Sequence, residues 1–168
     1  VAEDYFHAGR PEQRALMQSS TKSVTGALVG IAIDEGCLPG VDETMMTYFP
    51  ELADRLDDPR KNDITIEQLL AHRAGYAWEE SSPELLEMLY QGFLPDQMAL
   101  VEVPLVRDPG SGHDYSNLSS HLLAVIVSRA CEVDLLDFAT EHLFDPLGID
   151  PGDWTQDWDG YRWGAGEL

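Results

Sequence analysis

Cysteine is scarce in this chain of 168 residues. Cys37 and Cys131 lie far apart, and no CxxC pair or Cys/His cluster accompanies them. This pattern gives no support for a disulfide scaffold or a zinc site. We therefore expect both thiols to fill space in the core.

Long hydrophobic runs are absent. The longest apolar stretch, from Val24 to Ile33, has ten residues, whereas a membrane-spanning helix needs about twenty. We therefore expect no transmembrane helix. The first residues, from Val1 to Asp4, include no initiator Met and no basic segment followed by an apolar one. They are typical of a processed product or a fragment and leave the cellular compartment open.

Positive charge is also scarce. The chain has 10 basic and 31 acidic residues, which gives a formal net charge of −21. Such a surplus repels phosphate backbones and anionic lipids, so nucleic-acid and membrane partners are not expected. The chain is 43% hydrophobic and includes four Trp, six Tyr and five Phe. This composition indicates a folded unit, and we expect a single domain over residues 1–168.

Apolar periodicity predicts a mainly α chain. A stretch that is apolar nearly all round, with Ser and Thr before it and Gly36 after it, predicts a capped and buried helix over about 20–36. A four-residue apolar spacing predicts a helix over about 118–131. The turn-rich stretch 104–117 predicts a loop. Further helices are expected over about 43–56, 65–73, 82–91, 96–103 and 135–144, with no assignment beyond 150. The helix over 65–73 opens with Thr65 and Gln68, a TxxQ pattern close to a capping box.

Ser19 and Lys22 are spaced i and i+3 at the start of the first predicted helix. Side chains at this spacing lie on one face, one turn apart. A helix N-terminus favours an oxyanion near Ser19, and a lysine amine beside an apolar helix can act as a base, so the pair suits covalent acyl transfer. The alternative is structural: a Ser or Thr caps the helix and Lys22 is a solvated charge.

Tyr115 and Asn117 form a second pattern, where the loop meets the helix over 118–131. Two residues apart in an extended stretch, they would project to the same side. A phenol beside an amine can carry a proton between nucleophile and leaving group, and an amide can orient a substrate carbonyl. Alternatively, Ser116 or Asn117 caps the helix and Tyr115 packs under the loop.

Three longer stretches carry a family resemblance. MQSSTKSVTGALVGIAIDEG is similar to the nucleophile helix of the serine hydrolases with a penicillin-recognising fold, which include class C β-lactamases, DD-peptidases and related esterases and amidases. ITIEQLLAHRAGYAWEE is similar to the LLxHxSG segment of that family. DPGSGHDYSNLSSHLLAVIV, followed by FATEHLFDPLGI, is similar to its tyrosine loop and the helices after it. The Trp-rich tail ending in WGAGEL looks most similar to the branch with 6-aminohexanoate-oligomer hydrolases and carboxylesterases.

The resemblance implies a role for each motif residue. Ser19 would be the acylated nucleophile, Lys22 its general base, Tyr115 the proton shuttle and Asn117 a substrate-orienting amide. Trp78, just after the HxxG turn, would line the substrate pocket. The reaction implied is attack on an ester, amide or β-lactam carbonyl of a small molecule, with no metal or organic cofactor.

The resemblance is partial, because family members are about twice this length. We expect the chain to be the helical region of the β-lactamase/DD-peptidase-like α/β fold, with most of the central antiparallel sheet missing. The third family motif, a Lys, His or Trp before a small residue and Gly, would lie beyond Leu168. Its strand supplies one oxyanion-hole amide, and losing one such donor costs a factor of about 10²–10³ in rate. The chain could therefore be a weak enzyme or a non-catalytic helical binding module, and its uncovered surface could support self-association.

Other polar groups are given structural or solvated roles. His72 and His113 have no matched acid partner in the sequence, so they are not placed in the site. The acidic pairs Asp57–Asp58 and 79–80 lack the spacing of a calcium loop and are interpreted as solvated faces.

Overall fold

The computed structural model describes residues 4, 6, 9–10, 13–78, 82–83 and 102–168. Over these residues the chain is helical, as expected, and the extended pairings are isolated bridges. The α-helices are α1 (Thr21–Asp34), α2 (Ile66–Leu70), α5 (Asn117–Cys131), α6 (Leu135–Ala139) and α7 (Asp145–Leu147). The 3-10 helices are η1 (Gln18–Ser20), η2 (Met45–Tyr48), η3 (Pro50–Arg55) and η4 (Pro59–Asp63), and η6 (Thr140–Phe144) is a π-helix. Within the described ranges, no helix is long and apolar enough to cross a bilayer.

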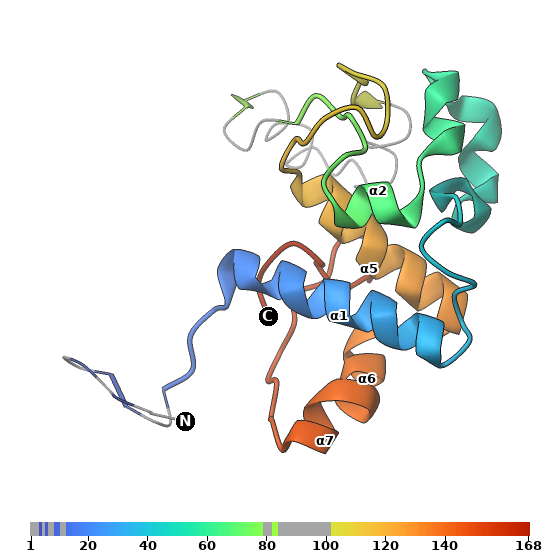
Figure 1. Ribbon diagram of the computed structural model, residues 1–168. Helices are drawn as coiled ribbons and strands as arrows, with labels where there is room; N and C mark the ends of the chain where they lie inside the picture. The colour runs from blue at the N-terminus through green and yellow to red at the C-terminus, as the bar shows by residue number, and fades with distance from the viewer. Residues whose placement is uncertain (1–3, 5, 7–8, 11–12, 79–81, 84–101) are drawn as a thin grey trace.

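Helices α1 and α5 pack against each other at the centre of the fold (Figure 1). The more deeply buried of the two is α5, every residue of which is buried from Leu118 to Ser128. The expectation that the first helix is buried all round was wrong, because Ala27 and Gly30 are exposed. Helix α1 packs only the face that carries Leu28, Val29 and Ala32. The open face of α1 bears small side chains, whose exposure costs little.

Several predicted helices differ from those found. The helix expected over 43–56 is replaced by η2 and η3, because Pro50 cannot donate the backbone bond that would continue η2. Helix α2 begins at the predicted capping box of Thr65 and Gln68 but ends at Leu70, since His72 adopts a left-handed φ of 52°. The helix over 135–144 is present but widens into the π-helix η6. The helices expected over 82–91 and 96–103 lie almost wholly outside the described residues.

Cys37 and Cys131 form a disulfide, so the expectation of two separate core thiols was wrong. Cys131 is the last residue of α5, and Cys37 lies three residues beyond the end of α1. Their Cα atoms are 5.0 Å apart, although 94 positions separate them along the chain. The pairing follows from how α1 and α5 pack, which no local pattern predicts.

The acidic pair Asp57–Asp58 lies at the surface, with Asp57 exposed and Asp58 half-buried, and both carboxylates are paired with basic side chains. Asp57 forms an ion pair with Lys61, whose side chain is fully buried and donates to the carbonyl of Val103 at 2.8 Å. Burial lowers the pKa of Lys61 below its ordinary value, although nearby carboxylates oppose the shift. Asp58 accepts bonds from the backbone and guanidinium of Arg60. Both acids therefore tie the η4 turn together.

The turn after α2 supports the loop that carries Tyr115. Tyr76 pairs with Leu105 in an antiparallel bridge, and the Val106 N–H donates to the Gly75 carbonyl at 2.9 Å. Gly75 has a φ of +90°, and a Cβ at this position would lie 2.5 Å from the Arg107 carbonyl oxygen. Only glycine fits this crossing, because both the conformation and the space exclude a side chain.

Replacing Gly75 by Ala is therefore expected to lower the free energy of unfolding by about 2–4 kcal/mol, which combines left-handed strain with a clash against rigid backbone. Urea denaturation followed by circular dichroism measures the change. Gly160→Ala is the matched control, since Gly160 has a φ of +89° with nothing within 4 Å of the added Cβ. Equal losses in the two variants would contradict the steric part of this prediction.

Candidate active site

Ser19 and Lys22 meet where η1 leads into α1. Ser19 is exposed in η1, and Lys22 is in the first turn of α1. The Lys22 Nζ lies 3.2 Å from the Ser19 Oγ, within hydrogen-bonding distance. Ser20, at the N-cap position of α1, makes no side-chain capping bond, so the expected capped start is not found. The hydroxyl of Ser19 and the amine of Lys22 are therefore directly paired.

Tyr115 comes from the loop before α5 and lies beside this pair. The Lys22 Nζ is 4.9 Å from the centroid of the Tyr115 ring, which is a cation–π contact with the face of the ring. The Tyr115 ring also packs against the ring of His72, with centroids 4.9 Å apart. Tyr115 is 42% exposed. The fold thus brings Ser19, Lys22 and Tyr115 together although 96 positions separate the first from the last.

The two other predicted site residues are Asn117 and Trp78. Asn117 is the first residue of α5, and Ser116 before it caps the helix by accepting from the Ser119 N–H at 3.2 Å. Trp78 is half-buried and packs against the hydrophobic core, two residues after the Tyr76 bridge. The substrate-binding roles of Asn117 and Trp78 stay predictions.

His72 holds the tyrosine loop in place. Its Nδ1 accepts from the Ser116 N–H at 3.2 Å, and its carbonyl accepts from the Asp114 N–H at 2.8 Å. The rings of His72 and His113 meet edge to face at 5.9 Å. His72 therefore holds the backbone on both sides of Tyr115 by hydrogen bonds. This is a structural role, as the sequence indicated.

The C-terminal segment supplies contacts that the sequence analysis missed. It runs beside the start of α1 (Figure 1), where the Met17 N–H donates to the Leu168 carbonyl at 2.9 Å. The Lys22 Nζ donates to the Ala165 carbonyl at 2.7 Å, and the Thr25 hydroxyl donates to the Gly164 carbonyl at 2.8 Å. These acceptors are backbone atoms, so no side-chain pattern could have revealed them.

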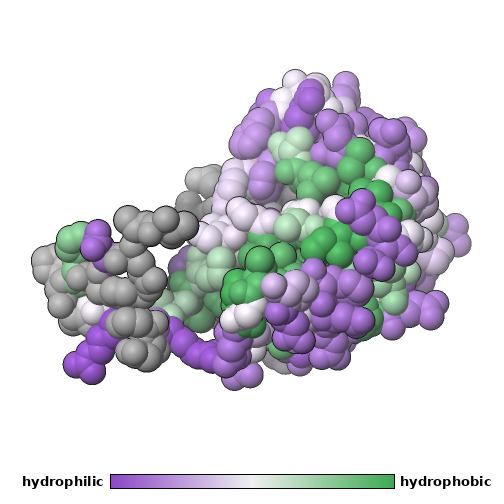
Figure 2. All heavy atoms as spheres, turned by 60° about the horizontal axis from the view of Figure 1, so that its bottom comes forward, coloured by the Kyte–Doolittle hydropathy of each residue, from purple (hydrophilic) through white to green (hydrophobic). Residues whose placement is uncertain are grey.

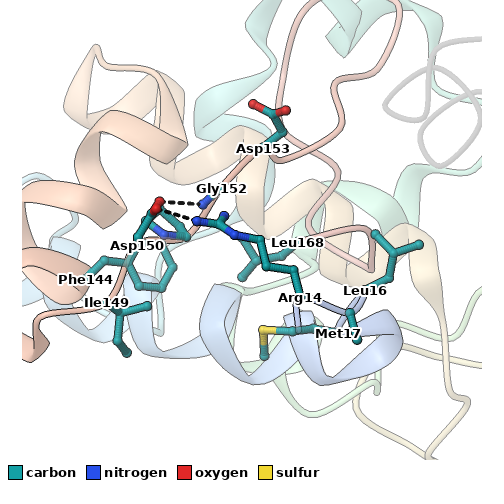
Figure 3. Close-up of a pocket in the computed structure, with 11 residues that line it drawn as sticks. Arg14, Leu16, Met17, Phe144, Ile149, Asp150, Gly152, Asp153 and Leu168 are labelled. Atoms are coloured by element: carbon teal, nitrogen blue, oxygen red, sulfur yellow. Dashed lines mark hydrogen bonds and ion pairs between the residues drawn. The ribbon is translucent and has the colours of Figure 1, made fainter. Parts of the chain in front are cut away.

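A pocket of about 440 Å³ lies next to the segment that leads into Ser19 (Figure 3). The ion pair of Arg14 and Asp150 spans it, and Gly152 donates to the same carboxylate. The lining comes from residues 14–17, Phe144, 149–153 and Leu168, and includes none of Ser19, Lys22 and Tyr115. This pocket is therefore separate from the paired hydroxyl and amine.

The side of the molecule that carries α6 and α7 bears an apolar surface. Figure 2 shows hydrophobic residues gathered in the middle of that face, with hydrophilic residues around them. Exposed apolar side chains near the pocket include Leu16, Leu147 and Ile149. Among the residues that the structure describes, no group of three or more His, Cys, Asp or Glu side chains could hold a metal ion.

The helical fold agrees with the comparison to known proteins. The family model described as Beta-lactamase matches residues 5–157, so the chain belongs to this family. Protein Rv1367c of Mycobacterium tuberculosis is 34% identical over 162 residues, which cover 84% of this chain and 40% of that protein. Lovastatin esterase of Penicillium rubens is 28% identical over 151 residues, which cover 79% of this chain and 37% of the esterase.

Solved structures show the same fold. A Bacillus anthracis protein described as a 6-aminohexanoate-dimer hydrolase superposes with a TM-score of 0.71 over 100% of this chain and 47% of its own, at 20% identity. That identity supports the fold alone. Simvastatin synthase from Aspergillus terreus is 29% identical with a TM-score of 0.60, over 81% of this chain and 36% of its own. The chain thus spans less than half the length of these relatives.

Proposed function

We propose that this chain carries the catalytic helices of a serine hydrolase that works through an acyl-enzyme. The 3.2 Å contact between the Lys22 Nζ and the Ser19 Oγ is the observation that carries the proposal. Membership of the Beta-lactamase family supports the proposal. Two relatives carry the names of acyl-bond hydrolases, an esterase and a D-alanyl-D-alanine carboxypeptidase. The substrate class is a small ester, amide or lactam.

The proposed reaction has two halves. The Ser19 Oγ attacks the substrate carbonyl carbon while the Lys22 amine takes the hydroxyl proton. Tyr115 then gives its proton to the leaving oxygen or nitrogen and takes the proton held by Lys22, so the acyl bond breaks and an ester on Ser19 remains. Water attacks that ester, and its proton returns through the same groups, releasing the acid and free Ser19. In this structure the Lys22 amine faces the Tyr115 ring. The Tyr115 side chain therefore has to reorient so that its hydroxyl can exchange a proton with the amine.

Two parts of the site would come from outside this chain. No Lys, His or Trp before a small residue (Ala, Ser or Thr) and Gly follows Asn117 in residues 118–168, and a site without the oxyanion-hole amide of that motif would acylate more slowly. The apolar face in Figure 2 is where we infer that the family's sheet would pack, because the chain spans only part of its relatives. Asn117 and Trp78 would orient the substrate from the helical side.

Covalent labelling of Ser19 tests the proposal directly. After incubation with a fluorophosphonate, intact-protein mass spectrometry is expected to show one adduct, which peptide mapping places on Ser19. Ser19→Ala removes the nucleophile and is expected to abolish the adduct. Ser20→Ala, which changes the neighbouring exposed hydroxyl, is expected to keep it.

The competing function is a non-catalytic helical module. Its signature would be a well-folded chain, judged by circular dichroism, that gains no adduct even after prolonged incubation. An adduct that persists in Ser19→Ala would also count against the proposed mechanism, because another residue would then be the nucleophile.

A further inference from the structure

His121 lies in the first half of α5 and is fully buried. Its Nδ1 accepts from the Gly164 N–H at 3.3 Å, so this nitrogen carries no proton. The Nε2 must then carry the proton, and it donates to the Asp157 Oδ2 at 2.8 Å. The ring stacks on Trp163, with centroids 4.4 Å apart. Every polar atom of the imidazole is therefore committed to the C-terminal segment.

Asp157 is anchored as firmly as the histidine. Its side chain is 5% exposed, and its Oδ1 accepts from the backbone N–H groups of Asp159 and Tyr161, each at 2.9 Å. Burial raises the pKa of Asp157, but the bond to His121 and these backbone N–H groups outweigh it and hold the pKa below its ordinary value. A carboxylate therefore faces the imidazole Nε2–H, which fixes the tautomer and the ring orientation.

Gly164 is held from both sides. Its N–H is bound by His121, and its carbonyl accepts from the Thr25 hydroxyl on α1. A Cβ on Gly164 would lie 2.6 Å from the Ser120 carbonyl oxygen and 2.6 Å from the Ala124 Cβ. The backbone therefore lies directly on α5. The next residue, Ala165, presents the carbonyl that accepts from the Lys22 Nζ.

We propose that His121 and Asp157 are positioning residues for Lys22. They fix the backbone at Gly164 so that the Ala165 carbonyl holds the lysine amine beside the Ser19 hydroxyl. Neither residue touches Ser19 or Lys22, and both act through the backbone between them. That this placement speeds acylation of Ser19 rests on the proposed function, whereas the placement of the Lys22 amine itself does not.

Two amide substitutions at His121 separate the two hydrogen bonds. His121→Asn keeps an acceptor near the position of Nδ1 and loses the donor to Asp157. His121→Gln keeps a donor near the position of Nε2 and loses the acceptor for Gly164. Both variants remove the buried ring, so they provide matched controls for loss of stability, which thermal unfolding measures.

The first readout is the rate at which the fluorophosphonate labels Ser19. His121→Gln is expected to slow labelling about 10- to 100-fold, the range that a small misplacement of a catalytic group produces. His121→Asn is expected to stay within about threefold of the unmodified chain, since it retains the acceptor that positions Gly164. Equal slowing in both variants, in proportion to their loss of thermal stability, would overturn the proposal.

A second readout is independent of Ser19. Limited acetylation with acetic anhydride, followed by peptide mass spectrometry, reports how accessible and reactive the Lys22 amine is. We expect several-fold faster acetylation of Lys22 in His121→Gln than in His121→Asn, because the amine then lacks its fixed acceptor. Should Ser19 never be labelled while this difference is found, the proposed function fails and the positioning role stands. Identical acetylation in the two variants refutes the positioning role.

Discussion

Replacing Lys22 by methionine is expected to slow the fluorophosphonate labelling of Ser19 by about a thousandfold, within the range that general-base catalysis supplies. Methionine keeps most of the length and the apolar character of the lysine stem but cannot accept a proton. It also loses the contact with the Ser19 hydroxyl, the bond to the Ala165 carbonyl and the cation–π contact with Tyr115. Time courses of adduct formation by intact-protein mass spectrometry measure the rate.

Lys22→Arg is the control that distinguishes the role of Lys22 as a proton acceptor from its role as a positive charge. Arginine keeps a positive charge that can donate to the Ala165 carbonyl and lie over the Tyr115 ring, but it does not deprotonate in proteins. We expect it to label as slowly as Lys22→Met while unfolding at nearly the temperature of the unmodified chain. Rapid labelling of Lys22→Arg would show that Lys22 contributes its charge and not proton transfer.

Removing the disulfide is expected to have the largest effect on stability. Cys37 and Cys131 close a loop with a sequence separation of 94, and cross-linking a loop of this size stabilises the folded state by about 4–5 kcal/mol through the unfolded chain. The double variant Cys37→Ala, Cys131→Ala is expected to lose about this much free energy of unfolding. Urea denaturation measures it.

Reduction supplies the matching control for the disulfide. Dithiothreitol is expected to lower the urea midpoint of the unmodified chain to nearly that of the double alanine variant, and to leave the variant unchanged. An unmodified chain whose midpoint does not respond to complete reduction, checked by thiol counting, would show that the disulfide contributes little.

The parts of the fold that the sequence predicted well are those that local chemistry decides. Helix α5 begins and ends within one residue of its prediction, because its apolar spacing and the Ser116 cap lie in a continuous stretch. The capping box at Thr65 formed as expected for the same reason. Ser19 and Lys22 could be predicted to meet, since one helical turn joins them.

The parts that the sequence left open depend on packing between distant segments. The helix expected over 43–56 failed because Pro50 outweighs the apolar spacing around it. The disulfide, the burial of Lys61 and the role of His121 each need a partner more than 30 positions away or a backbone group, such as Val103 or Gly164, that leaves no side-chain pattern. Tyr115 was placed near Lys22 by family resemblance, not by any local signal.

The disulfide and the candidate site occupy opposite ends of the same two helices. Lys22 and Tyr115 meet at the N-terminal ends of α1 and α5, and Cys37 and Cys131 join their C-terminal ends. The 14 residues of α1 make a lever arm about 21 Å long. The disulfide therefore joins α1 and α5 at the ends farthest from Lys22 and Tyr115, and it limits how far the two helices can move apart.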